Sequence, residues 1–205
     1  GGIDLEKGQC PLLVEANERV AVRGPRGSGK STLAELIVGL REPSEGVVLF
    51  DGNDIGDIAR MSIRTQMDLV RGCELVDGSV MDNIRLGRSD IPGEKIRRVL
   101  ERLGILNELL ELADGLRTEV SRSGAPLSRT MVLMLMLARA AVGAPRALVI
   151  DGVLDELDPA SLSGAVAVLC DRNAPWSLLV TTTRDALSAD TDGVIVPDHT
   201  TAYER

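Results

Sequence analysis

The spacing of hydrophobic residues along the chain alternates between two patterns. Short apolar runs, such as Val47–Phe50 and residues 147–150, are typical of buried strands. Between such runs, apolar residues recur every three or four positions, as in 31–40 and 94–103, which predicts amphipathic helices. Strands that alternate with helices favour an α/β fold with a mainly parallel sheet.

The pattern assigns an element to most of the chain. The expected strands cover 12–14, 19–22, 47–50, the end of 63–70, 147–151, 177–181 and 194–196. The expected helices cover 31–40, 79–84, 94–103, 106–112, 128–142 and 161–170, with a loop at 115–126. Residues 73–144 are mostly helical, so we expect one domain in which this inserted α-helical subdomain interrupts a core of 1–72 and 145–205. The first strands form an antiparallel β portion.

A glycine-rich segment lies between the strand at 19–22 and the helix at 31–40. Residues 24–31 (GPRGSGKS) match the phosphate-binding loop G-x-x-x-x-G-K-[ST] at every required position. Glycines let the backbone N–H groups face phosphate oxygens, and the helix N-terminus adds partial positive charge. A glycine-rich turn with a chance lysine is the alternative, and the flanking strand and helix argue against it. The loop predicts a P-loop NTPase core.

Each residue of this loop has an expected role. Lys30 would reach the β- and γ-phosphates, and Ser31 would place its hydroxyl on Mg²⁺. The run 147–151 (ALVID) ends in Asp151, which would emerge at the same sheet edge and complete the Mg²⁺ site. The predicted nucleotide-binding residues are Gly24, Arg26, Gly27, Ser28, Gly29, Lys30, Ser31 and Thr32, and the predicted metal ligands are Ser31 and Asp151.

Composition excludes several other functions. The formal net charge is −8 without a basic stripe, and the aromatic residues are only Phe50, Trp176 and Tyr203, so no nucleic-acid partner is expected. The three cysteines (Cys10, Cys73 and Cys170) are far apart, which indicates free thiols in a reducing compartment. No apolar run is long enough to span a bilayer.

The segment 131–137 (MVLMLML) is apolar on every side. One interpretation is a helix buried inside the domain. The other is an adaptable methionine surface for a transmembrane partner or a second nucleotide domain. The sequence leaves both open.

The order of these blocks resembles the nucleotide-binding domain of an ABC transporter of the exporter type. The resembling blocks are 18–24 (ERVAVRG), 46–52 (GVVLFDG), 77–84 (DGSVMDNI), 137–140 (LARA), Pro145, Asp151 and 157–159 (LDP). The resemblance implies binding of ATP and Mg²⁺ on the cytoplasmic side of a membrane. It also implies two partners, a transmembrane domain of the same or a partner chain and a second nucleotide-binding domain. The abrupt start suggests a piece of a longer transporter.

The chain departs from this family's pattern at the catalytic positions. Gly152 stands where the family has a glutamate that polarises water, Thr183 stands in place of the switch histidine, and Gly72 stands in place of the Q-loop glutamine. His199 is too late in the chain to match the switch histidine and is expected at the surface. No aromatic residue for adenine stacking precedes Gly24.

The signature segment is altered as well. It reads LSRTM at 127–131, in which Ser128 is retained for contact with the partner domain, whereas Arg129 and Thr130 replace glycines. We therefore expect weak or no hydrolysis, and a heterodimer with a more competent partner is favoured over a productive homodimer.

Two alternatives to this function stay open, and the sequence argues against a third. The first is an active ATPase in which Asp155 or Glu156 supplies the missing carboxylate. The second is a regulator or scaffold outside transport, with a structural ATP site. The third, an unrelated P-loop kinase, would need a lid and acceptor-binding residues that the sequence does not show.

Overall fold

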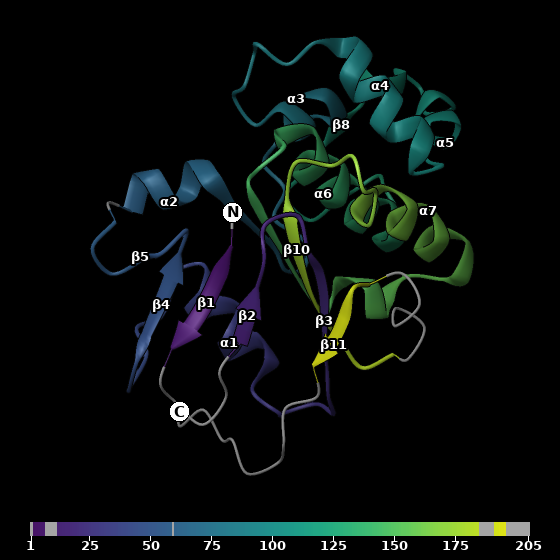
Figure 1. The fold of residues 1–205 in the computed structure, drawn as a ribbon. Helices are drawn as coiled ribbons and strands as arrows, with labels where there is room; N and C mark the ends of the chain where they lie inside the picture. The colour runs from purple at the N-terminus through teal and green to yellow at the C-terminus, as the bar shows by residue number, and fades with distance from the viewer. Residues whose placement is uncertain (1, 7–11, 59, 185–190, 196–205) are drawn as a thin grey trace. The chain divides into compact units, whose positions relative to one another are not determined.

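The computed structural model describes residues 2–6, 12–58, 60–184 and 191–195 of the 205-residue chain (Figure 1). It divides into two compact units. The first unit comprises 1–70, 145–155 and 172–205, and the second comprises 71–144 and 156–171. The sequence division placed 156–171 with the core, whereas in the structure this segment packs with the helical unit.

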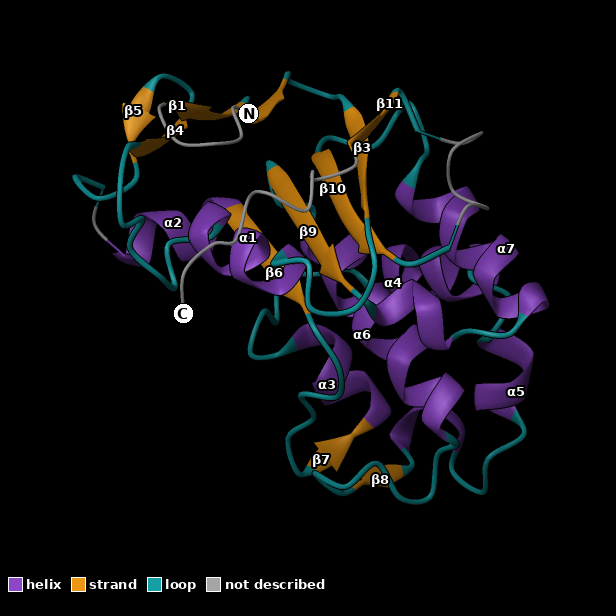
Figure 2. Cartoon of the chain, turned by 90° about the horizontal axis from the view of Figure 1, so that it is seen from below, coloured by secondary structure: helices purple, strands orange, loops and turns teal. Residues whose placement is uncertain are grey.

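A five-stranded parallel sheet forms the centre of the first unit (Figure 2). Its strand order is β11-β3-β10-β9-β6, and every neighbouring pair is parallel. The sheet is built from continuous apolar runs, which are typical of strands that are covered on both faces. Its strands are β3 (Arg19–Arg23), β6 (Met67–Val70), β9 (Ala147–Asp151), β10 (Ser177–Thr182) and β11 (Gly193–Ile195). The mainly parallel sheet expected from the sequence is confirmed.

A second, antiparallel sheet lies in the same unit, with strand order β2-β1-β4-β5. Its strands are β1 (Ile3–Glu6), β2 (Leu12–Val14), β4 (Val47–Phe50) and β5 (Asn53–Asp54). β2 and β3 are consecutive in the sequence but belong to different sheets. β1 and the two-residue β5 were not predicted, because neither has an apolar run long enough to mark a strand.

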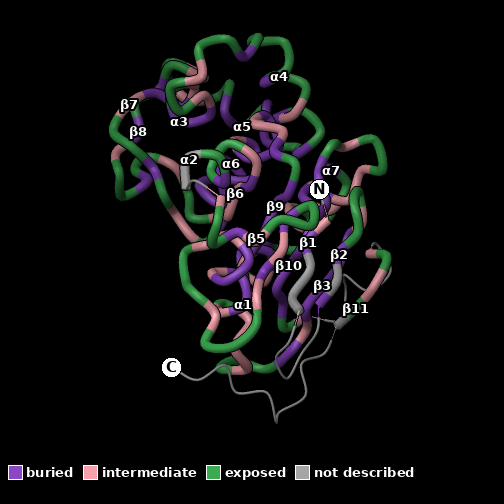
Figure 3. Tube along the Cα trace, turned by 60° about the vertical axis from the view of Figure 1, so that its left-hand side comes forward, coloured by how far each residue is buried: buried purple, intermediate pink, exposed green. Residues whose placement is uncertain are grey.

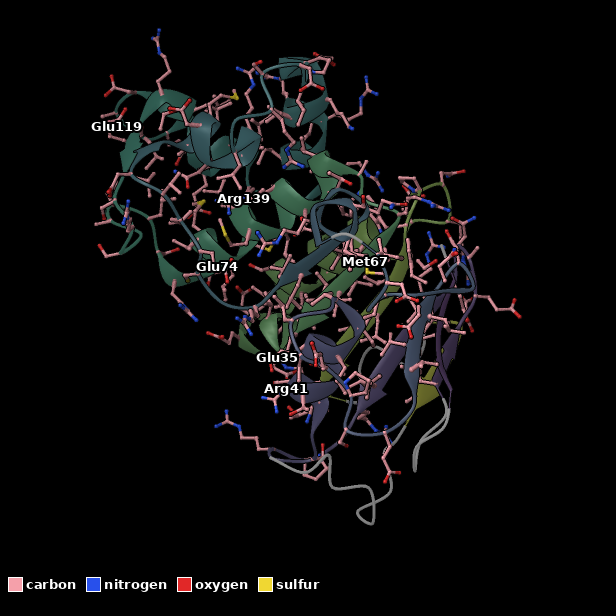
Figure 4. All side chains as sticks on the ribbon, turned by 90° about the vertical axis from the view of Figure 1, so that its left-hand side faces the viewer. Glu35, Arg41, Met67, Glu74, Glu119 and Arg139 are labelled. Atoms are coloured by element: carbon pink, nitrogen blue, oxygen red, sulfur yellow. The ribbon has the colours of Figure 1, made fainter. Side chains whose placement is uncertain are left out.

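Among the described residues, two α-helices lie wholly within the first unit. α1 (Lys30–Ile37) ends before the predicted residue 40, since Gly39 adopts a positive φ of 69°. An ion pair of 3.2 Å joins Glu35 of α1 to Arg41 just beyond its end (Figure 4). α2 (Arg60–Gln66) directly precedes β6, so the segment 63–70 holds the expected strand only in its second half.

The second unit is mostly helical. It contains α3 (Val80–Arg85), α4 (Gly93–Arg102), α5 (Leu106–Leu110), α6 (Arg129–Gly143), α7 (Pro159–Leu169) and the short 3₁₀ helix η1 (Gly115–Arg117). β7 (Gly78–Ser79) pairs with β8 (Glu119–Val120), which lies inside the segment predicted as a loop. A further 3₁₀ helix, η2 (Val153–Glu156), spans the point where the chain passes from the first unit to the second.

Helix α6 is the core of the second unit. The seven side chains of 131–137 are each at most 4% exposed, and α3, α4 and α7 pack around the helix (Figure 3). The hypothesis of a methionine surface for a partner is therefore wrong, and the buried interpretation holds. An apolar helix surrounded by other helices needs no polar face.

Candidate nucleotide site

The phosphate loop connects the end of β3 to the start of α1. Gly27 and Gly29 adopt φ values of 82° and 85°, a region that residues with a Cβ rarely occupy. An added Cβ at Gly27 would meet no atom within 4 Å, so the backbone conformation rather than space requires glycine there. The N-cap of α1 is Gly29, which has no side chain to cap the first turn. The N–H groups of that turn have no intrahelical acceptor and suit an anion.

The ammonium group of Lys30 folds back over the loop. Its Nζ donates hydrogen bonds of 2.7 Å to the carbonyl oxygens of Gly24 and Pro25. Burial lowers the pKa of Lys30, while the negative charges of Asp155 and Asp151 act in the opposite direction. The cation is thus held on backbone oxygens at the centre of the loop. Phosphate oxygens can replace these carbonyl oxygens as acceptors. The ammonium group would then bind oxygens that carry negative charge, which makes stronger hydrogen bonds.

Strand register brings Asp151 to the same sheet edge as the loop. Thr181 of β10 pairs with Asp151 on one side and with Val22 of β3 on the other. The Asp151 Oδ1 accepts a hydrogen bond of 2.5 Å from the Thr181 hydroxyl. Its Oδ2 has no hydrogen-bond partner among the described residues, and Ser31 is exposed on the first turn of α1. One carboxylate oxygen and one hydroxyl fit a Mg²⁺ ion, which keeps most of its water ligands.

Within the described ranges of the chain, no group of three or more His, Cys, Asp or Glu residues is placed to hold a metal ion. A structural zinc site of the usual four-ligand kind is therefore not built from these residues.

Gly152 follows Asp151 in a left-handed conformation. Its φ is 69°, and its N–H donates to both the carbonyl oxygen and the hydroxyl of Thr181, at 3.2 and 3.1 Å. No atom lies within 4 Å of an added Cβ. A glutamate at this position would have room for its Cβ, but its backbone would be strained.

Asp155 binds the end of β10. Its Oδ1 accepts a hydrogen bond from the Thr182 hydroxyl at 2.5 Å. Its Oδ2 accepts hydrogen bonds from the Thr183 N–H at 2.9 Å and from the Thr183 hydroxyl at 2.8 Å. The Arg184 guanidinium donates to the Asp155 backbone oxygen at 2.6 Å. The hydroxyl of Thr183, which stands in place of the switch histidine, is thus directed to Asp155.

The contact between Asp155 and Thr183 has no local sequence signal, because it joins residues 28 positions apart. The parallel pairing of β9 with β10 brings the two segments together.

Glu156, the next residue, is engaged within the second unit. Its carboxylate accepts a bidentate pair of hydrogen bonds from Arg129, with the shortest contact at 2.9 Å, and this pairing raises the pKa of Arg129. Arg129 also donates to the Cys73 sulfur at 2.6 Å. Sequence analysis did not find this cluster, because its members are 27 or more positions apart along the chain.

Ser128 caps the helix that follows it. Its Oγ accepts a hydrogen bond of 3.1 Å from the Met131 N–H. Capping uses the oxygen as an acceptor, so the hydroxyl hydrogen is left to donate to another group. The cap therefore does not prevent the contact with a partner's nucleotide that the sequence predicts for Ser128.

The remaining candidates are the Q-loop position, the cysteines and the single histidine of the chain. Gly72, at the Q-loop position, adopts a φ of 72°. Cys73 and Cys170 form no disulfide, while Cys10, His199 and Tyr203 lie outside the described residues. In the part of the chain that the structure describes, no helix combines the length and apolarity that crossing a membrane requires.

Comparison with known proteins gives consistent matches. Residues 9–154 match the family model described as ABC transporter. A multidrug efflux ATP-binding/permease protein of Mycobacterium bovis is 32% identical over 191 residues, covering 93% of this chain and 16% of that protein. An ATP-dependent lipid A-core flippase of Chromobacterium violaceum is 35% identical over 161 residues, covering 78% of this chain and 26% of the flippase.

One solved structure is similar to almost the whole of this chain. A bacterial Atm1-family ABC exporter with ATP bound superposes with a TM-score of 0.86 at 25% sequence identity. The match covers 97% of this chain and 37% of the exporter chain. This chain therefore spans well under half of the length of each of these three proteins.

Proposed function

Because this chain belongs to the ABC transporter family, we propose that its phosphate loop binds Mg-ATP with weak or no hydrolysis and that ATP binding is coupled to a transmembrane partner. The observation that supports binding most directly is the loop itself. Two glycines in left-handed conformations and an uncapped helix start present N–H groups to an anion, with Lys30 above them.

The expected ligand contacts follow from this geometry. Backbone N–H groups of 27–32 hold phosphate oxygens, and Lys30 contacts the terminal phosphates. Ser31 and the free oxygen of Asp151 hold Mg²⁺, directly or through water. Bound Mg²⁺ would offset the charge of the phosphates, and the chain's residues would fix its position.

Weak hydrolysis follows from three local features. Gly152 has no side chain with which to orient water, and the Asp155 carboxylate is occupied by three hydrogen bonds from Thr182 and Thr183. The Glu156 carboxylate is paired with Arg129, and both residues belong to the second unit. General-base loss typically costs about 10²–10⁴ in rate. These contacts disfavour the alternative of an active ATPase that uses Asp155 or Glu156 as a substitute base.

The partners are proposed from family membership. The flippase and efflux relatives are transport proteins by name, so we expect a transmembrane domain as one partner and a second nucleotide-binding domain as the other. The domain would then work on the cytoplasmic side of a membrane. Arg129 and Thr130 weaken the site that this chain completes in its partner, which favours a heterodimer. A regulator or scaffold that binds ATP without transport is the second candidate.

Calorimetric titration of Mg-ATP into the chain tests the binding half of this proposal. We expect saturable binding at one site per chain that is weakened when Mg²⁺ is chelated. Absence of heat and of displacement of a fluorescent ATP analogue would contradict the proposal. Binding of equal affinity with and without the chelator would contradict the roles of Ser31 and Asp151 as metal ligands. It would leave the assignment of the loop as the phosphate site unchanged.

A further inference from the structure

The carboxylate of Asp155 is held by uncharged donors. The groups that bind it are the hydroxyls of Thr182 and Thr183 and one backbone N–H. The nearby Arg184 guanidinium binds the backbone oxygen of Asp155. Among the described residues, no cation forms an ion pair with the carboxylate. Neutral donors fix its position without removing its negative charge.

A short series of contacts places this charge beside the phosphate loop. Thr182, which binds the carboxylate, pairs with Arg23 at the end of β3. The Thr182 carbonyl oxygen accepts a hydrogen bond of 3.3 Å from the N–H of Gly24, the first residue of the loop. The Gly24 carbonyl in turn accepts the hydrogen bond from Lys30. All of these residues belong to the first unit.

The charge of Asp155 also acts on Lys30. Of the two carboxylates that counter the effect of burial on the pKa of Lys30, Asp155 is the stronger, ahead of the predicted metal ligand Asp151. Lys30 is the residue expected to contact the terminal phosphate. The charge of Asp155 therefore acts on the residue expected to contact the terminal phosphate, which ATP has and ADP lacks.

We propose that Asp155 is a specificity-determining residue of the nucleotide site, one that weakens the binding of ATP relative to ADP. This inference rests on the proposed function, since it requires a nucleotide on the loop. ATP carries one more phosphate and more negative charge toward the carboxylate than ADP does. Repulsion between like charges in a partly dehydrated site falls mainly on the longer nucleotide.

Substitution of Asp155 by asparagine tests the inference. Asp155→Asn removes the charge and keeps the shape, so the ratio of ATP to ADP affinity should rise by about three- to tenfold, the scale of one charge interaction across several ångströms. Asp158→Asn makes the same change three residues further on, at the exposed N-cap of α7, where asparagine also caps well. Its affinity ratio should stay within about twofold of the unaltered chain. Both ratios are measured by calorimetry in Mg²⁺.

The outcomes separate this inference from the proposed function. An unchanged ratio in Asp155→Asn, with both nucleotides bound by the unaltered chain, overturns the role of Asp155 alone. An equal rise of the ATP-to-ADP affinity ratio in Asp158→Asn also overturns it. Such a rise would show that the ratio depends on the net charge of the chain rather than on the position of Asp155. If the unaltered chain binds neither nucleotide, the proposed function fails first. Should Asp155→Asn not fold, Asp155→Ser removes the same charge, keeps a hydroxyl for Thr182 and is read in the same way.

Discussion

The phosphate loop at 24–32 and the turn at 151–155 lie at the same edge of the parallel sheet. They differ in the groups they use, which are backbone N–H groups in the loop and side chains in the turn. The loop binds with backbone N–H groups, whose direction is set by the left-handed Gly27 and Gly29. The turn depends on individual side chains, and its carboxylate at Asp155 is bound by Thr182 and Thr183. Binding built from backbone geometry persists through many side-chain substitutions, whereas general-base catalysis depends on a single side chain, whose loss typically costs about 10²–10⁴ in rate.

The largest expected effect comes from removing the cation of the loop. Lys30→Ala should lower ATP affinity by about 100-fold or more, because charge-assisted hydrogen bonds to phosphate are lost. Lys95→Ala is the matched control, since Lys95 is exposed on α4 in the other unit and should leave affinity unchanged. Calorimetry measures both variants, and equal affinities would contradict the assignment of the loop.

Raising the pH should weaken binding through the same residue. Burial lowers the pKa of Lys30 below its ordinary value of 10.5. The charged form therefore prevails below the lowered pKa, and ATP affinity should fall as the pH rises through it. Lys30→Arg stays charged over this range, so its weaker affinity should be independent of pH. Parallel pH curves for the two chains would show that another group titrates.

Restoring a carboxylate at Gly152 should have a limited effect on turnover. Gly152→Glu should raise phosphate release by less than about tenfold, because Thr183 and Gly72 remain and because Asp155 keeps the end of β10 in place. Full recovery of ATPase activity in this single variant would contradict the account.

The same variant should also cost stability. A side chain in the left-handed conformation of Gly152 should destabilise the chain by about 1 kcal/mol, which urea unfolding can measure. Gly152→Asn serves as the control, because asparagine tolerates this conformation better and supplies no base.

The smallest effect is expected at the Arg129–Glu156 pair. Its side chains are 57% and 46% exposed, so Glu156→Gln should change the free energy of unfolding by about 0–1 kcal/mol. Glu108→Gln, an exposed substitution on α5, gives the baseline. A loss well above that range in urea unfolding would mean that the pair organises the start of α6.

Most of the fold could be predicted from the sequence, because apolar runs and helical spacing report burial directly. The phosphate loop and the strand ending at Asp151 were predicted from local motifs of a few residues. The contacts of Asp155 with Thr183 and of Glu156 with Arg129 were not, since they join residues 28 and 27 positions apart. Periodicity also could not decide whether the apolar helix at 131–137 is buried or covered by a partner.

Two further features had no sequence signal. The strand β1 and the strand β5 are too short or too polar to stand out. The attachment of α7 to the helical unit depends on packing between side chains. Gly164 of α7, for example, approaches the backbone of Leu103 so closely that an added Cβ would lie 2.6 Å from the Leu103 oxygen.

The proposal to be tested first is that the loop binds ATP with weak or no hydrolysis at the turn beside it. It is tested most directly by incubating an excess of the chain with Mg²⁺ and ATP labelled at the γ-phosphate, then separating bound nucleotide from free phosphate over time. The expected result is that most of the label remains on ATP bound to the chain, with phosphate release close to that of the Lys30→Ala control. Stoichiometric release of labelled phosphate from the bound fraction would contradict it.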